Sequence, residues 1–72
     1  MFLTKREEEI MKFAVLGFPD KGIAGKLNIS VRTVNTHMTR IYNKNGVKNR
    51  AEAVAMYLKD VMFYGVSAFS LM

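Results

Sequence analysis

The chain has 72 residues, half of them hydrophobic, and a formal net charge of +5 at neutral pH. This length makes one small domain, and the apolar content argues against intrinsic disorder. Cysteine is absent and His37 is the one histidine, which excludes disulfides and a cysteine-based zinc site. We therefore predict no metal, no cofactor and no catalytic residue, and we do not expect an enzyme.

The positive charge is confined to the middle of the chain. No acid occurs between Asp20 and Glu52, whereas the rest of the chain has four bases against all six acids. The seven bases of this acid-free window are Lys21, Lys26, Arg32, Arg40, Lys44, Lys48 and Arg50. An ordinary solvated helix mixes both signs, because Glu and Lys four residues apart stabilise each other. The window therefore requires a separate explanation.

The first predicted helix begins after Thr4, which forms a capping-box pattern with Glu7, and runs to about Leu16 before Gly17. Its apolar side consists of Ile10, Met11, Phe13 and Ala14. The glutamates at its start are explained by the helix dipole, which favours negative charge there.

A short second helix is predicted to start at Pro19 and Asp20, with Asp20 as its N-cap. Its buried stripe consists of Ile23, Ala24 and Leu27. Gly22 and Gly25 cost up to ~1 kcal/mol each relative to alanine, so this helix needs its neighbours. The turn that follows is 28–30, where Asn tolerates a left-handed backbone and Ser30 caps the next helix.

A third helix is predicted over 31 to about 44, ending at Asn45 and Gly46. Its core stripe consists of Val31, Val34, Met38, Ile41 and Tyr42. His37 lies at the edge of this stripe and is interpreted as a half-buried structural residue. The opposite face carries Arg32, Asn35, Thr36, Thr39 and Asn43, with Thr33, Arg40 and Lys44 beside them.

The polar face of this third helix suits the major groove of DNA. Short hydrogen-bonding side chains match base edges, and the flanking bases and hydroxyls can reach phosphates. Carboxylates are absent because a nucleic-acid duplex would repel them. A short helix, a three-residue turn and a second helix with a polar outer face form the helix-turn-helix arrangement.

A fourth helix is predicted from the cap Asn49 to about Tyr64, before Gly65. Its core side is expected to hold Ala53, Val54, Tyr57, Leu58 and Val61, whereas Met56, Met62 and Phe63 point away. The apolar stretch 61–72 is too short to span the ~30 Å core of a membrane, and Lys59 and Asp60 prevent a longer span, so we expect no membrane partner; its last part, 66–72, is an apolar tail. The predicted organisation is a helix-turn-helix domain over 1–65 followed by this tail.

The chain resembles the LuxR/GerE-type helix-turn-helix domain of bacterial transcription regulators over residues 3 to about 60. The matching stretches are LTKREEEIM at 3–11, Gly17, KGIAGKLNIS at 21–30, RTVNTHMTRIYNK at 32–44 and GVKNRAEAV at 46–54. The resemblance implies an all-α, four-helix fold, binding of the third helix in the major groove, and homodimers formed through the fourth helix.

The resemblance also implies roles for individual residues. The base-reading positions fall on Asn35, Thr36 and Thr39, with Arg32 on the same face. The phosphate-contacting positions fall on Lys21, Thr33, Lys44 and Lys48, to which Arg40 is added. The expected dimer interface consists of Met56, Lys59, Met62 and Phe63.

The chain departs from the family pattern at four positions. Gly22 replaces a usual Glu, Gly25 a longer residue, and Asn45 a usual Leu, which removes a core side chain. Asn35 stands where Lys is frequent, and its amide is able to pair with adenine.

Two function classes remain. The first is a sequence-specific transcription regulator that binds double-stranded DNA in the cytoplasm, associated with the nucleoid. The alternative is an interaction module of the same fold that pairs with another regulator and modulates it. The acid-free third helix favours the first class, and the apolar tail with the looser second helix keeps the second open.

Overall fold

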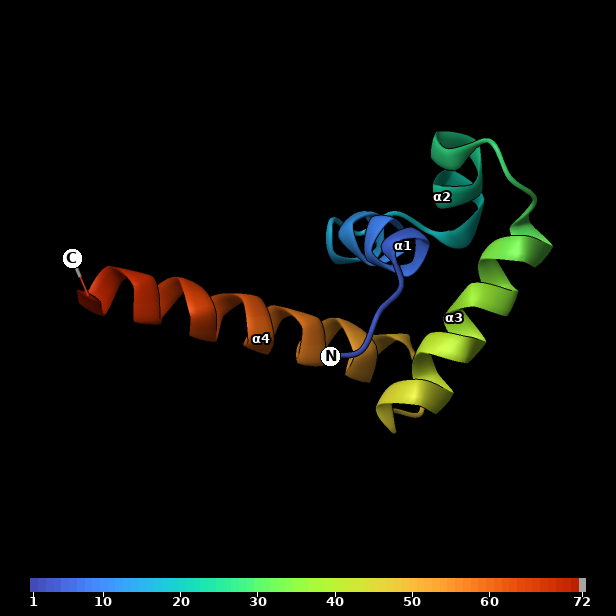
Figure 1. Cartoon of the computed structure of the whole chain (residues 1–72). Coiled ribbons are helices and arrows are strands. Elements are labelled where there is room, and N and C mark those ends of the chain that lie inside the picture. Colours follow the sequence, from blue (N-terminus) through green and yellow to red (C-terminus); the bar gives the residue numbers. More distant parts are fainter. Residues whose placement is uncertain (72) are drawn as a thin grey trace.

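In the computed structural model, the described backbone, residues 1–71, folds into four helices and contains no strand. They are α1 (Lys5–Val15), α2 (Asp20–Leu27), α3 (Val31–Asn45) and α4 (Arg50–Leu71) (Figure 1). Side chains are described for residues 1–62. The side chain of Phe63 and the side chains of the segment 66–72 therefore lie outside the described residues. The predicted all-α, four-helix fold is confirmed, and within the described part no helix is long and apolar enough to cross a membrane.

The predicted caps of α1 and α4 are present. The Thr4 hydroxyl accepts from the Glu7 N–H at 3.2 Å, and the Glu7 carboxylate accepts from the Thr4 N–H at 2.8 Å, which completes the capping box. At the start of α4, the Asn49 side-chain oxygen accepts from the Glu52 N–H at 2.9 Å. These bonds satisfy amide groups that have no partner inside the helix.

The turn between α2 and α3 also follows the prediction. Asn28 has a left-handed backbone with φ 56°, which ends α2. The Ser30 hydroxyl accepts from the Thr33 N–H at 3.0 Å and so begins α3. Gly46, with φ 66°, ends α3 in the conformation that glycine adopts most easily.

The predicted N-cap of α2 was wrong. Pro19 occupies the cap position without a side-chain bond, and Asp20 is the first residue of the helix. The Asp20 carboxylate instead accepts from Arg50 at 2.7 Å, and the same guanidinium also donates to the carbonyl of Phe18. The acid therefore joins the start of α2 to the start of α4.

The core lies where α1, α2, α3 and the first turns of α4 meet. Its buried hydrophobic residues are Ile10, Met11, Ala14, Ile23, Ala24, Val34, Met38, Ile41 and Ala53. The stripe of α3 begins one turn later than predicted, because Val31 is exposed and burial starts at Val34. His37 is half-buried, as predicted.

Two predictions for α4 were wrong. The helix does not end before Gly65 but continues to Leu71, because a lone glycine costs only ~1 kcal/mol in a helix and is a weak stop signal. Leu58 and Val61, expected to be buried, are 39% and 52% exposed. Among the described side chains of α4, those that reach the core are in its first turns, Ala53, Val54 and Tyr57, before the helix leads away from α3 (Figure 1).

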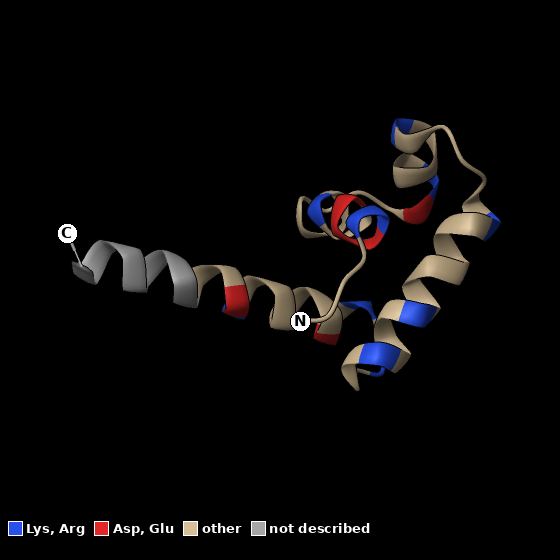
Figure 2. Ribbon diagram, in the orientation of Figure 1, with Lys and Arg blue, Asp and Glu red and all other residues tan. Residues whose placement is uncertain are grey.

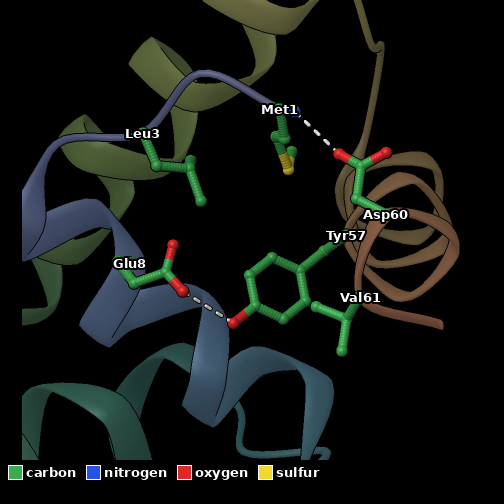
Figure 3. A pocket seen from close by; sticks show the side chains of 6 residues that line it. All are labelled: Met1, Leu3, Glu8, Tyr57, Asp60 and Val61. Atoms are coloured by element: carbon green, nitrogen blue, oxygen red, sulfur yellow. Dashed lines mark hydrogen bonds and ion pairs between the residues drawn. The ribbon is translucent and has the colours of Figure 1, made fainter. Parts of the chain in front are cut away.

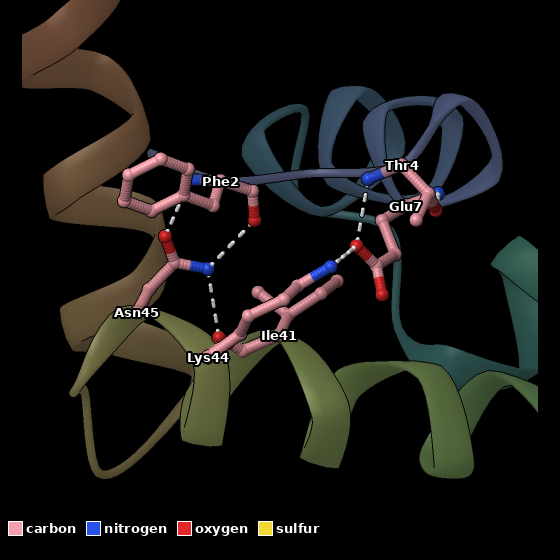
Figure 4. A network of polar contacts seen from close by, with 6 residues as sticks. All are labelled: Phe2, Thr4, Glu7, Ile41, Lys44 and Asn45. Carbon is pink, nitrogen blue, oxygen red and sulfur yellow. Dashed lines mark hydrogen bonds and ion pairs between the residues drawn. The ribbon is translucent and has the colours of Figure 1, made fainter.

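Asn45 ties the amino-terminal segment to α3. Its side-chain oxygen accepts from the Phe2 N–H at 2.6 Å, and its side-chain nitrogen donates to the carbonyls of Phe2 at 3.0 Å and Ile41 at 2.9 Å (Figure 4). Met1 and Leu3 pack against the core beside this clamp. The amide therefore holds the segment before α1.

Candidate nucleic-acid interface

The outer face of α3 is exposed and free of acids. Figure 2 shows Lys and Arg along α3 and neither Asp nor Glu on it. The exposed polar residues of this face are Arg32, Thr33, Asn35, Thr36, Thr39, Arg40, Asn43 and Lys44. The structure thus brings all four predicted base-reading residues together on one exposed surface, which we call the α3 face.

Two threonines of the α3 face have a defined orientation. The Thr36 hydroxyl donates to the carbonyl of Arg32 at 3.0 Å, and the Thr39 hydroxyl donates to the carbonyl of Asn35 at 3.0 Å. Each bond runs back one turn along the same helix, a common arrangement for threonine. The hydroxyl protons therefore point at the helix backbone.

Thr33, a predicted phosphate contact, lies in the first turn of α3. Its hydroxyl is 2.8 Å from the hydroxyl of Ser30, and both side chains are exposed. The amino end of a helix carries partial positive charge, which attracts anions. This end of α3 therefore presents hydroxyls and a favourable dipole to a phosphate.

Lys44, another predicted phosphate contact, is joined to α1. Its ammonium forms an ion pair with the carboxylate of Glu7, which is only 3% exposed (Figure 4). Burial by itself raises the pKa of Glu7, but the bonds from Lys44 and Thr4 and the charge of Lys44 outweigh it, so that this pKa lies below its ordinary value. Lys44 therefore has a structural partner in addition to its place on the α3 face.

The other predicted phosphate contacts are differently placed. Arg40 is exposed on α3, Lys21 in the first turn of α2, and Lys48 in the turn before α4. Within the described residues, none of the three forms an ion pair with a carboxylate. Their charges therefore remain available to an external anion.

Arg50 is a structural residue of the acid-free window that sequence reasoning did not single out. It bonds to Asp20 and to the carbonyl of Phe18, as described above. Arg50 and Asp20 are 30 positions apart, and no local pattern in the chain connects them. A basic residue in the window thus links the start of α4 to the start of α2 through its side chain.

The predicted dimer residues on α4 are only partly exposed. Met62 is 63% exposed and Lys59 is exposed, but Met56 is half-buried, and the side chain of Phe63 lies outside the described residues. Four exposed small and apolar residues of α4 fall three or four positions apart and so share one side, which we call the α4 face. The α4 face consists of Ala51, Ala55, Leu58 and Met62, whereas Val61, which is also exposed, lies off this line.

A pocket of about 280 Å³ lies between α1 and α4. It is lined by Met1, Leu3, Glu8, Tyr57, Asp60 and Val61 (Figure 3). The Tyr57 hydroxyl donates to Glu8 at 2.9 Å, and burial together with this carboxylate raises the pKa of Tyr57. Asp60 accepts from the Met1 ammonium at 2.7 Å. The polar groups of the pocket thus bond to one another.

Comparison with known proteins identifies the family. Residues 1–57 match the model of "Bacterial regulatory proteins, luxR family". The curated relatives include the HTH-type transcriptional regulator MalT of Klebsiella pneumoniae strain 342 and that of Cronobacter sakazakii strain ATCC BAA-894. Each is 38% identical over 89% of this chain. The chain spans only 7% of the length of these relatives. The chain belongs to the LuxR family of bacterial regulatory proteins and carries its helix-turn-helix domain.

Proposed function

We propose that this chain is the DNA-binding part of a transcription regulator and that α3 enters the major groove of double-stranded DNA. The observation that carries the proposal is the exposed α3 face, which combines amide, hydroxyl and basic groups with no acid. A helix that only faces water has no reason to exclude carboxylates, whereas one that faces phosphates does. Membership in a family of regulatory proteins supports the same function.

The roles follow from position and exposure. Asn35, Thr36, Thr39 and Arg32 contact base edges, because they form the centre of the α3 face. Lys21, Thr33, Arg40 and Lys48 contact phosphates and fix the orientation of the helix on the duplex. Lys44 joins them at the end of α3 while its partner Glu7 holds it in place.

A salt titration tests this function. If each monomer neutralises four phosphates, the association constant should fall as salt rises. A plot of the logarithm of the association constant against the logarithm of the salt concentration should then have a slope of roughly −4 per monomer. Fluorescence polarisation on mixed genomic DNA and on a site selected from random DNA measures both slope and specificity. An affinity that does not change with salt contradicts the proposal.

We also propose that the domain works as a two-fold homodimer through the α4 face. Leu58 and Met62 would form the centre of the contact, with Ala51 and Ala55 allowing the helices to approach closely. Isolated apolar residues are common on surfaces, but four aligned on one helix side are typical of an interface. A two-fold dimer would place two copies of α3 about one helical turn (~34 Å) apart on an inverted repeat.

Sedimentation tests the dimer. The variant Leu58→Glu/Met62→Glu should be monomeric where the wild type is dimeric, because four buried carboxylates would oppose each contact. A matched variant, Lys12→Glu on the exposed side of α1, changes charge away from the α4 face and should stay dimeric. A wild type that remains monomeric with and without DNA overturns the dimer.

The α4 face also favours the second function, in which the domain pairs with another regulator. A wild type that is monomeric and shows no binding to mixed genomic DNA would support it over DNA binding. If the first function holds, the place of action is the nucleoid in the cytoplasm.

A further inference from the structure

We infer that the α3 face selects A·T base pairs, because Thr36 and Thr39 present methyl groups rather than hydroxyl protons to the major groove. This inference rests on the proposed DNA binding and adds the class of base pair that is read. It is carried by the two hydroxyl bonds to the helix backbone, together with the amide of Asn35 on the same exposed face.

The hydroxyl bonds determine what each threonine offers. A hydroxyl has one proton, and in Thr36 and Thr39 that proton is donated to the carbonyl four residues back. The methyl group occupies another staggered position on the same Cβ, and both side chains are exposed. Each threonine therefore offers a methyl group and an accepting oxygen, but no donor.

A G·C pair is a poor match for this pair of groups. Guanine presents the acceptors N7 and O6 in the major groove, and an accepting hydroxyl oxygen cannot bond to either. Cytosine offers an amino group but no methyl. An A·T pair offers the adenine amino group to the oxygen and the thymine methyl to the threonine methyl.

Asn35 points to the same base pair. Its amide has both a donor and an acceptor, the combination that pairs with N7 and the amino group of adenine. Asn35 and Thr39 are four residues apart, or ~6 Å along the helix, which corresponds to about two base-pair steps. The three side chains can thus read neighbouring A·T pairs, while Arg32 is the one predicted base-reading residue with the cationic donors suited to guanine.

The probes are three duplexes of ~20 base pairs, about two helical turns: alternating A·T, alternating G·C, and alternating A·U. Uracil lacks only the methyl group of thymine, and the minor groove is unchanged. We expect tighter binding to A·T than to G·C. Replacing thymine by uracil should weaken binding roughly fourfold for each methyl contact, on the order of tenfold for both threonines.

Matched variants assign the effect to the threonines. Thr36→Val/Thr39→Val keeps the methyl groups and should keep the preference for thymine over uracil. Thr36→Ser/Thr39→Ser keeps the hydroxyls, loses the methyls and should bind both duplexes alike. These residues have similar helix propensities, and circular dichroism should show unchanged folding.

The outcomes separate this inference from the proposed function. Equal affinity of the wild type for A·T and A·U duplexes, or a preference for thymine that survives in the serine variant, overturns the inference and leaves DNA binding intact. Failure to bind any of the three duplexes contradicts the proposed function itself.

Discussion

The exposed faces of α3 and α4 depart from an ordinary solvated surface in opposite ways. The α3 face is polar and basic without any acid, whereas the α4 face is a line of small and apolar residues, Ala51, Ala55, Leu58 and Met62. Both helices bury their other side in the same core, through Val34, Met38 and Ile41 on α3 and Ala53 on α4. Burial accounts for only one side of each helix, and the opposite sides are the surfaces that we propose to bind DNA and a second copy of the chain.

The comparison predicts that each face can be disrupted without the other. The largest effect is expected for Thr36→Glu, because a carboxylate at the centre of the α3 face repels phosphates and removes a base contact. DNA affinity should fall ~100-fold or more in fluorescence polarisation. Leu58→Glu on the α4 face is the control and should leave affinity for a single half-site unchanged. Equal losses in both variants would refute the separation of the two faces.

A second effect concerns the support of the α3 face. Glu7→Ala removes both the capping box of α1 and the buried partner of Lys44, and should lower the free energy of unfolding by about 2–3 kcal/mol in urea denaturation. Glu9→Ala breaks the exposed pair with Arg6 and should cost under ~1 kcal/mol.

The contribution of Glu7 should also depend on pH. Because the pKa of Glu7 is lower in the folded state than its ordinary value, its stabilising effect is fully present above that ordinary value, near 4.5. It is lost as pH falls through the folded pKa. Urea denaturation of the wild type and of Glu7→Gln between neutral and acidic pH should show the two curves converging in acid. A constant difference would contradict the ion pair.

A third, smaller effect distinguishes contacts within the DNA-binding surface. Asn35→Ala should cost ~1–2 kcal/mol of binding free energy on the preferred site and little on random DNA. Lys48→Gln should weaken both alike and make the salt slope less steep by about one. Polarisation titrations at several salt concentrations measure both variants. Losses from Asn35→Ala that are identical on specific and random DNA would mean that Asn35 does not read bases.

The smallest effect concerns α2, which supports α3 without belonging to either face. A Cβ at Gly25 would meet nothing within 4 Å, so Gly25→Ala should raise the free energy of unfolding by up to ~1 kcal/mol. The matched variant Gly22→Ala should gain less, because its Cβ would lie 3.3 Å from the Phe18 ring. Thermal melting measures both. DNA affinity should be unchanged in both variants. A loss of DNA affinity would show that binding requires the flexibility that glycine gives to α2.

The helix order and most ends could be predicted because their signals are local. Thr4 with Glu7, Ser30 before α3 and Gly46 after it all act within one helical turn, where spacing in the sequence equals spacing in the structure. The exposed side of α3 was predictable for the same reason, since the helical period places Asn35, Thr36 and Thr39 together.

Features that depend on distant partners could not be predicted. Asp20 has the residue type of a cap, but its carboxylate bonds to Arg50 from another helix. Leu58 and Val61 have the period of a core stripe, yet α4 runs past the end of the core there. The same holds for Lys44, whose pairing with Glu7 spans 37 positions. Which residue meets which across the core depends on packing, and the helical period does not specify it.

The clamp made by Asn45 has a practical consequence for Phe2. Two of its three bonds go to the Phe2 backbone, and the Phe2 side chain is 76% exposed. The bonds of the clamp at position 2 therefore involve the backbone and not the side chain. Any residue with a backbone N–H should fit at this position. Proline, which has no backbone N–H, should not. Phe2→Cys would place a single thiol in a chain without cysteine, where a fluorescent dye could be attached.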